Sequence, residues 1–330
     1  MKVPGLIDLQ VNGYKGVDFS QPDLTEDTFT AACREMLQSG ATAFLATMIT
    51  SSDQSYAHNL PIIAKVASSS EFHGRVLGIH LEGPFISPVD GARGAHNQQW
   101  VRKADIYCLQ HLIDMAQNCV KLTTIAAELD GAAELAAFAA ENGIAVSLGH
   151  QMAGVNDLQR LADAGARALT HLGNGIPLVL PRHDNPIFAG LSVDKLSAMM
   201  ITDGHHLPAA VIKTFIRTKG VQKCIVTSDA TALSGMPPGR YQNLGNKVIL
   251  DKTGRIYNPM TGFLVGSSAT MLDCMNHLAS LNLVAFDDLA AMGFHNPLKL
   301  IGVQQSQLPA GPQVRFDEEQ SRFYILESPQ

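Results

Sequence analysis

Side chains that could hold a metal ion stand where several apolar runs of the sequence end. Glu82 ends the run RVLGIHLE, His150 ends IAVSLGH, and His171 lies near the end of ARALTHL. Two imidazoles and one carboxylate, with a position left for water, are the ligand set expected of a catalytic divalent cation such as zinc. Asp229, which ends KCIVTSD, could take a proton from that water and return it to a leaving nitrogen. The pattern predicts metal-dependent hydrolysis of an amide bond.

Each of these residues also has a purely structural explanation. A His that follows an apolar run is often a hydrogen-bonded structural residue, and an Asp or Glu at the end of a strand can cap the next helix. The metal hypothesis therefore depends on convergence. The three ligands come from separate runs and meet only if those runs belong to one closed sheet.

Eight apolar or β-branched runs alternate with longer amphipathic stretches, which favours a parallel sheet covered by helices. The predicted strands cover 6–11, 41–48, 75–82, 121–128, 144–150, 166–172, 196–203 and 223–229. Helices are expected at 25–39, 53–68, 100–118, 131–142, 154–164 and 207–219, with a last barrel helix beginning near Gly266 and a loop at 173–190. Such alternation predicts an α/β fold, a (β/α)8 TIM barrel whose active site lies at the carboxyl ends of the strands.

Local signals define some boundaries. The first helix shows Asp23 and Glu26 at capping-box spacing and should end at Gly40. We expect the catalytic barrel to span residues 1–308, with a β-hairpin inserted near 241–262 that turns at Lys-Thr-Gly. Residues 309–330 form a strand-like C-terminal tail, a reduced β appendage of the barrel.

The composition limits the possible partners. The chain has 330 residues, 46% hydrophobic and 16% charged, which suffices for a large core. A net charge of -6 without dense Lys or Arg runs argues against nucleic-acid and membrane partners. Five cysteines without C-x-x-C spacing indicate reduced thiols. The start MKVPGLIDLQ lacks signal-peptide features, and no apolar run approaches a membrane span, so we expect a cytoplasmic protein.

Several phrases occur in an informative order: PGLIDLQVNG, HLEGPFISP followed by GAHN, SLGH, THLGNG, DGHH, TSDAT and GSSATM. From about Pro4 to Ile301 the chain thereby resembles the N-acetylglucosamine-6-phosphate deacetylase family of the amidohydrolase superfamily. The resemblance implies Glu82, His150 and His171 as metal ligands and Asp229 as the catalytic acid and base. It also implies a small amino-sugar substrate from which an acetyl group is removed.

The resemblance implies a set of substrate contacts as well. These are Ala95, His96, Asn174, Gly175, His206, Leu264, Val265 and Gly266. In the family pattern His96 would polarise the acetyl carbonyl, Asn174 and Gly175 would face the sugar phosphate, His206 would lie near the phosphate, and the last three would line the sugar pocket. The alternative for His96 is a loop histidine that stabilises a turn.

Two positions differ from the usual patterns. Many amidohydrolases end strand one in an H-x-H pair that holds a second metal, whereas this chain has Gln10 and Asn12, whose amides bind cations poorly. We therefore predict one catalytic metal. The family's phosphate-binding Arg, which reaches in from a neighbouring subunit, lies in an R-E-P-G phrase that is PRHDNP here. Arg182 is its nearest equivalent and implies a homodimer, unless it is a surface residue paired with Asp184.

Three functions remain open at this point. The first is deacetylation of N-acetylglucosamine 6-phosphate or a close amino-sugar phosphate. The second keeps the metal chemistry but acts on an unphosphorylated N-acetyl sugar or another N-acyl compound, since Asp184 adds a negative charge near the expected phosphate. The third is a non-catalytic sugar-phosphate-binding barrel, which the joint presence of all three ligands and Asp229 disfavours.

Overall fold

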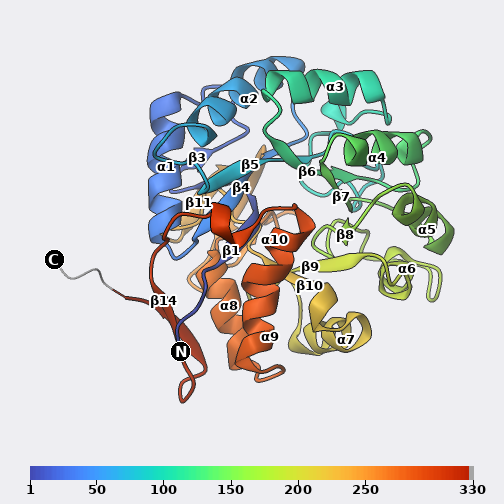
Figure 1. Cartoon of the computed structure of the whole chain (residues 1–330). Coiled ribbons are helices and arrows are strands. Elements are labelled where there is room, and N and C mark those ends of the chain that lie inside the picture. The colour runs from blue at the N-terminus through green and yellow to red at the C-terminus, as the bar shows by residue number, and fades with distance from the viewer. Residues whose placement is uncertain (327–330) are drawn as a thin grey trace.

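The computed structural model describes residues 1–326, and within them a parallel sheet of eight strands curls into a barrel (Figure 1). Its strands, each paired with the next in the sheet, are β1 (Ile7–Val11), β4 (Ala43–Ile49), β5 (Val76–Glu82), β6 (Val120–Ile125), β7 (Ala145–Leu148), β8 (Ala168–Leu169), β9 (Ser197–Ile201) and β10 (Cys224–Thr227). All eight predicted strands are confirmed, and the fold is the expected (β/α)8 barrel.

Helices surround this sheet and connect successive strands (Figure 1). They are α1 (Glu26–Gln38), α2 (Asp53–Ala67), α3 (Ile106–Met115), α4 (Ala132–Glu141), α5 (Val155–Asp163), α6 (Pro186–Ser192), α7 (Ala209–Lys219), α8 (Met271–Ser280), α9 (Phe286–Ala290) and α10 (Asn296–Leu300). A π-helical turn at Ala291–His295 joins the last two, and short 3-10 turns lie at Gln98–Trp100, Val221–Lys223 and Gln305–Gln307. Within residues 1–326, every helix is too short or too polar to span a lipid bilayer.

Four helix predictions need correction. The helix expected at 100–118 is α3, which begins only at Ile106 behind its N-cap Asp105. The capping box of α1 uses Thr25 and Thr28 rather than Asp23 and Glu26, because the Thr25 hydroxyl accepts from the Thr28 N–H. The expected loop at 173–190 contains the start of α6, whose N-cap Asn185 precedes a proline at the first helical position. The last barrel helix, α8, begins at Met271 and not near Gly266, since Thr270 provides its N-cap.

The barrel has an incomplete seam between β1 and β10. Only one parallel bridge, Val11 with Ala230, joins these strands within the described chain, together with a hydrogen bond from the Asn12 N–H to the Ala230 carbonyl at 2.7 Å. The buried Asp8 carboxylate accepts from the Thr227 hydroxyl at 2.8 Å, from the Ser228 N–H at 3.1 Å and from the Ser228 hydroxyl. Hydrogen bonds of the Asp8 side chain thus replace part of the backbone pairing that is missing between β1 and β10.

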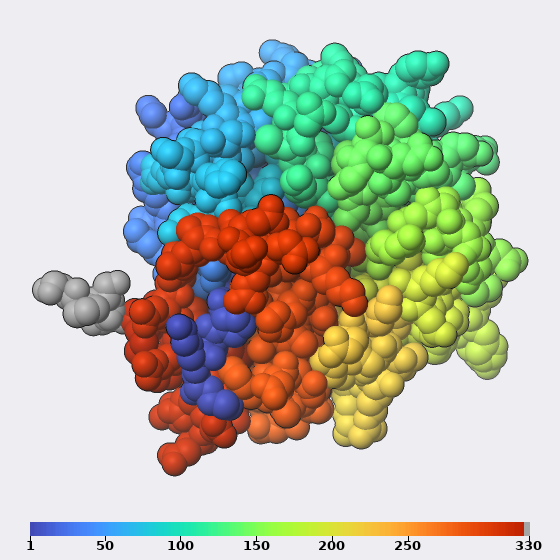
Figure 2. All heavy atoms as spheres, in the orientation of Figure 1, coloured from blue at the N-terminus to red at the C-terminus, as the bar shows by residue number. Residues whose placement is uncertain are grey.

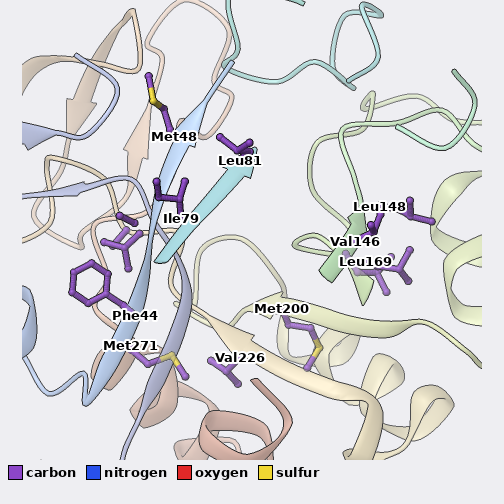
Figure 3. Close-up of a cluster of buried hydrophobic side chains, with 14 of the residues drawn as sticks. Phe44, Met48, Ile79, Leu81, Val146, Leu148, Leu169, Met200, Val226 and Met271 are labelled. Carbon is purple, nitrogen blue, oxygen red and sulfur yellow. The ribbon is translucent and has the colours of Figure 1, made fainter. Parts of the chain in front are cut away.

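Two apolar layers hold the barrel together. The outer layer packs the strands against the helices, and Figure 3 labels ten of its side chains, including Phe44, Met48 and Ile79 from neighbouring strands and Met271 from α8. The inner layer joins side chains from six strands, which can meet only inside the barrel. It is made of Ile7, Leu9, Ala43, Leu45, Leu122, Ala168, Met199 and Ile225, with Phe294, Leu298 and Ile301 covering the end opposite the site.

A register irregularity in β1 lies between Asp8 and Val11. Leu9 belongs to the inner apolar layer, yet the next residue, Gln10, also reaches side chains inside the barrel mouth. Strict alternation would send consecutive residues to opposite faces, and an irregularity of this kind removes that constraint. The shift therefore allows Gln10 to face inward.

Small antiparallel sheets complete the molecule. The predicted hairpin insertion is a three-stranded meander of β11 (Gly239–Asn243), β12 (Asn246–Leu250) and β13 (Ile256–Tyr257), with Lys-Thr-Gly in its second turn. The tail forms β14 (Val314–Asp317) and β15 (Arg322–Ile325), and its predicted end at 327–330 lies outside the described residues. The first residues run beside β14 (Figure 2), where the Val3 N–H donates to the Val314 carbonyl. A short pair, β2 (Gly13–Tyr14) and β3 (Val17–Asp18), follows β1.

Candidate metal centre and active site

The three predicted ligands converge at the carboxyl ends of their strands. The Nε2 atoms of His150 and His171 lie 3.1 Å apart, and they are 3.2 and 3.0 Å from Glu82 Oε1. All three side chains are buried, and their ligand atoms form a compact group. Each comes from a different part of the chain, so barrel closure alone brings them together.

The donor set fits one divalent cation. Three ligands about 2.0–2.1 Å from a tetrahedral ion lie roughly 3.3 Å from one another, close to the observed spacing. The Nδ1 of His150 is 2.9 Å from the Ala92 carbonyl, which can only accept, so Nδ1 carries the hydrogen and Nε2 presents its lone pair to the group. The Nδ1 of His171 is buried and has no partner among residues 1–326. The ring nitrogens of two imidazoles and a carboxylate therefore meet at one point, where His150 offers its lone pair.

The backbone is strained where the site residues stand. His150, His171 and Asp229 have φ angles of 51°, 28° and 52°, in the left-handed region that non-glycine residues rarely adopt. Gly175 lies against the His150 ring, and a Cβ at this position would be 2.9 Å from Nδ1. The strand ends are thus bent away from regular β geometry, and the loop after His171 approaches the imidazole closely.

Asp229 lies beside the ligands and is held by two amides. Gln10 Nε2 donates to Glu82 Oε1 at 2.7 Å and to Asp229 Oδ1 at 3.0 Å, and Asn12 Nδ2 donates to the same Oδ1 at 2.7 Å. No hydrogen bond from residues 1–326 reaches Asp229 Oδ2. That oxygen is consequently the one available for proton transfer. The carbonyl oxygens of both amides are buried and unpartnered in the described chain.

The two carboxyl groups differ in their electrostatic environments. Burial opposes the charge on Glu82, but the close contacts of its carboxylate with the imidazoles of His150 and His171 hold the pKa of this carboxyl well below its usual value. Burial and the neighbouring charge of Glu82 raise the pKa of Asp229. The two neighbouring carboxyl groups therefore differ: Glu82 favours the charged form and Asp229 the protonated form.

His96 joins the group from the loop after β5. Its Nε2 lies 3.3 Å from His150 Nε2 and 3.8 Å from Glu82 Oε2. Its Nδ1 accepts from the Thr50 N–H at 3.3 Å, so the hydrogen of the neutral ring is on Nε2. Burial and the neighbouring His150 lower the pKa of His96 to about 3, which keeps the ring uncharged. His96 thus presents an N–H donor to the site.

His80 lies below the ligands and is a structural histidine. Its Nδ1 donates to the Leu9 carbonyl at 3.1 Å, and its Nε2 lies 2.8 Å from the Thr124 hydroxyl, which donates to it. Burial lowers the pKa of His80 to about 4. Its two nitrogens are fully used, so it offers no lone pair to a metal.

A second acid–imidazole pair lies at the end of β9. Asp203 Oδ2 accepts from His206 Nδ1 at 2.7 Å, and Asp203 Oδ1 accepts from the backbone N–H groups of His205 and His206, both at 2.9 Å. The Ser267 hydroxyl also donates to Oδ2, at 3.2 Å. Although burial opposes it, the bonds from His206 hold the pKa of Asp203 below its usual value.

The other predicted substrate contacts occupy varied environments. Asn174 is half-buried, lines a small hollow with His150, and donates to the His171 carbonyl. The side chain of Val265 is buried in the core of the three-stranded meander, with Ala95 packed nearby. Leu264 is partly exposed, and Gly266 has no room for a Cβ beside Thr231. Arg182 is exposed and, in the described chain, forms no ion pair with Asp184.

Sequence reasoning missed the residues that support this site. Asp8 and Thr50 were not singled out, and Gln10 was interpreted only as a missing metal ligand. Alternation along β1 could have drawn attention to Asp8, because a charged residue in an otherwise buried strand needs partners. The Thr50–His96 contact joins two loops and has no local sequence signal.

Comparisons with known proteins agree with this geometry. The profile of the amidohydrolase family matches residues 1–292. N-acetylglucosamine-6-phosphate deacetylases from Homo sapiens and Vibrio furnissii are 33% and 30% identical to the chain; each alignment covers 92% of it, and 75% and 74% of those proteins.

Solved structures are similar over nearly the whole chain. A mutant N-acetyl-D-glucosamine-6-phosphate deacetylase from Mycobacterium smegmatis, in complex with N-acetyl-D-glucosamine-6-phosphate, has a TM-score of 0.86 at 25% identity, covering 98% of this chain and 84% of that one. The enzyme from Pasteurella multocida has a TM-score of 0.84 at 27% identity, covering 98% and 86%. The chain therefore belongs to the amidohydrolase family and, within it, to the N-acetylglucosamine-6-phosphate deacetylases.

Proposed function

We propose that this protein removes the acetyl group from N-acetylglucosamine 6-phosphate and releases acetate and the free amine. The observation that carries the proposal is the convergence of Glu82, His150 and His171 beside Asp229. The relatives that align over most of the chain have this activity in their names, and a similar structure holds this compound.

Glu82, His150 and His171 would hold a single zinc ion. When bound, such a cation supplies Lewis acidity toward a carbonyl and lowers the pKa of water. The positions of the H-x-H pair are occupied by Gln10 and Asn12, whose N–H groups point at carboxylates and would repel a second cation. We therefore propose one metal per chain.

Asp229 moves the proton. Its Oδ1 is held by two amide donors, which leaves Oδ2 to accept a proton from the attacking water. Burial of this carboxyl disfavours its charged form and so favours holding the proton until the bond to nitrogen breaks. Amide cleavage needs this return step because an amine anion is a very poor leaving group. One carboxyl group thus serves as base and then as acid.

His96 and the surrounding loops position the substrate. His96 donates from Nε2 toward the acetyl carbonyl, in the neutral form that Thr50 fixes. We assign His206 to the phosphate. Asn174 and Gly175, beside the His150 ring, and the backbone of residues 264–266 complete the sugar site.

The test is acetate release from N-acetylglucosamine 6-phosphate by protein that has been chelated and reloaded with zinc. Asp229→Asn should lower kcat by about 10²–10⁴-fold while metal content stays at one ion per chain. Asp317→Asn, at the end of β14 in the C-terminal hairpin, is the matched control and should keep wild-type kcat. Wild-type kcat in the Asp229→Asn variant would refute the assigned role.

A second candidate substrate is an unphosphorylated N-acetyl sugar. Arg182 is exposed and forms no ion pair in the described chain, and Asp184 stands close by in sequence. The ratio of kcat/KM for the phosphorylated and plain sugars decides between them. A ratio near one favours the second candidate. A large ratio that falls in Arg182→Ala supports a phosphate role for Arg182.

We further propose a cytoplasmic homodimer. The five cysteines are free, as expected of a reducing compartment. The dimer is supported by Arg182, which lies on an exposed loop from which it could reach a neighbouring site. Sedimentation at micromolar concentration gives the mass directly, and a monomer that deacetylates at full rate would refute the dimer.

A further inference from the structure

The carboxylate of Asp203 makes four hydrogen bonds and joins two segments of the barrel mouth. One oxygen accepts the backbone N–H groups of His205 and His206, which closes the turn after β9. The other accepts from the His206 ring and from the Ser267 hydroxyl. The side chains of Asp203 and His206 are only 3% and 6% exposed, so water competes little for these bonds.

The bond to His206 decides which ring nitrogen faces outward. A carboxylate only accepts, and at 2.7 Å the Nδ1 of His206 must carry the hydrogen that it donates. The Nε2 of His206 has no hydrogen-bond partner among residues 1–326. It is the free end of the pair, and a contact with phosphate, whose oxygens only accept, requires a hydrogen on this nitrogen as well.

The bond to Ser267 reaches the predicted sugar site from the other side. Ser267 directly follows the segment Leu264–Gly266, and its N–H donates to the Asp229 carbonyl at 3.1 Å. Its carbonyl accepts from the Thr231 N–H at 3.0 Å. Asp203 therefore ties the end of β9 to the segment that crosses the end of β10.

We propose that Asp203 is a positioning residue, which fixes the orientation of His206, balances the charge of a ring that carries a hydrogen on both nitrogens, and anchors the 264–267 segment around the amino-sugar phosphate. The inference rests on the proposed function, because it takes His206 as a substrate contact. Asp203 itself touches no reacting atom, so its loss should weaken substrate binding and leave the chemical step nearly intact.

The variant Asp203→Asn tests this assignment. Asparagine keeps an oxygen for the two backbone N–H groups but turns an N–H₂ toward the imidazole, which must then lose its hydrogen from Nδ1 and with it the positive charge that attracts a phosphate. We expect KM for N-acetylglucosamine 6-phosphate to rise about tenfold or more, while kcat stays within about threefold. In a His206→Ala background the same substitution should change KM by less than about twofold, because the imidazole is absent and the Ser267 hydroxyl can accept from the asparagine N–H₂ instead.

Asp317→Asn is the matched control. Asp317 accepts the N–H groups of the second and third following residues, as Asp203 does, but has no imidazole partner. Its KM should stay at the wild-type value. An Asp203→Asn protein with wild-type KM, or an equal rise of KM with and without His206, would overturn the proposal.

A ¹⁵N NMR measurement on the wild-type protein tests the proposal without an activity assay and without a variant that must fold. In ¹⁵N-histidine-labelled wild-type protein, with His206 assigned by comparison with His206→Gln, Nδ1 of this ring should be protonated. An unprotonated Nδ1 would overturn the proposal even in an active enzyme. If the wild type released no acetate, the proposed function would fail while the nitrogen spectrum still decided the role of Asp203.

Discussion

Replacing Gln10 with leucine removes the amide that connects the metal site to the proton-transfer group. Its Nε2 donates to Glu82 at 2.7 Å and to Asp229 at 3.0 Å, both buried. A hydrogen bond to a charged group contributes about 1.5–3 kcal/mol, so the two bonds together contribute roughly 3–6 kcal/mol. Leucine offsets part of this lost free energy, because it buries apolar surface and removes the unpartnered Oε1 of Gln10. We expect a net loss of about 3 kcal/mol in the free energy of unfolding.

The same substitution should weaken metal binding. Residues that hold a metal ligand in place typically affect affinity by about 10–100-fold, and Gln10 is such a residue for Glu82. Urea unfolding of chelated protein gives the stability loss, and competition with a chromogenic chelator gives the metal affinity. A Gln10→Leu protein that binds zinc within about twofold of the wild-type affinity refutes this reasoning.

Asn296→Leu provides the matched control for this experiment. Asn296 is also buried, and its Nδ2 donates two bonds of 2.8 Å, but to the carbonyls of Val221 and Cys224 at the amino end of β10. Both substitutions should therefore destabilise the fold. Only Gln10→Leu should reduce metal affinity, because only Gln10 contacts a ligand.

Three further predictions concern the metal and the buried polar groups. Chelation should abolish acetate release and zinc should restore it; release that survives complete removal of metal would contradict a metal-dependent reaction. The His80 pKa falls from its ordinary 6.5 to about 4, so the folded state binds fewer protons between these values. The free energy of unfolding should therefore fall by about 3 kcal/mol as the pH decreases through this window, a component that urea titrations of His80→Gln should lack. Asp8→Ala should cost about 3 kcal/mol in urea unfolding because it strands the donors at Thr227 and Ser228, whereas Asp8→Asn should cost about 1 kcal/mol; equal losses would argue against these bonds.

The barrel was predictable because parallel strands covered on both faces give near-continuous apolar runs. The residues at which the strands end were harder to predict. The run 166–172 yields only the two-residue strand Ala168–Leu169, since the backbone turns into the left-handed region at His171 to aim its ring at the site. The helix at Pro186–Ser192 was missed because its Asn-Pro start lies in a proline-rich stretch that also fits a loop.

The convergence of Glu82, His150 and His171 was predictable for a related reason. Strand ends in a barrel share one mouth, so polar residues at those ends meet whatever their separation in sequence. The residues that hydrogen-bond to these side chains and hold them in place could not be predicted in the same way. Gln10 faces inward because of a register shift in β1, and the tautomer of His96 depends on a backbone N–H at Thr50. Both features arise from tertiary packing and leave no pattern in the local sequence.

The seam between β1 and β10 couples substrate binding to the stability of the closed barrel. Gln10 and Asn12 approach Asp229 from one side of this seam, and Asp229 stands on the other. Separating the two strands would break the single backbone bridge between Val11 and Ala230. The same event would break the hydrogen bonds from Gln10 and Asn12 to Asp229. A molecule that binds to both strands stabilises the closed barrel and lowers the frequency with which the strands separate. We therefore expect a bound substrate to stabilise the fold of the enzyme that cleaves it.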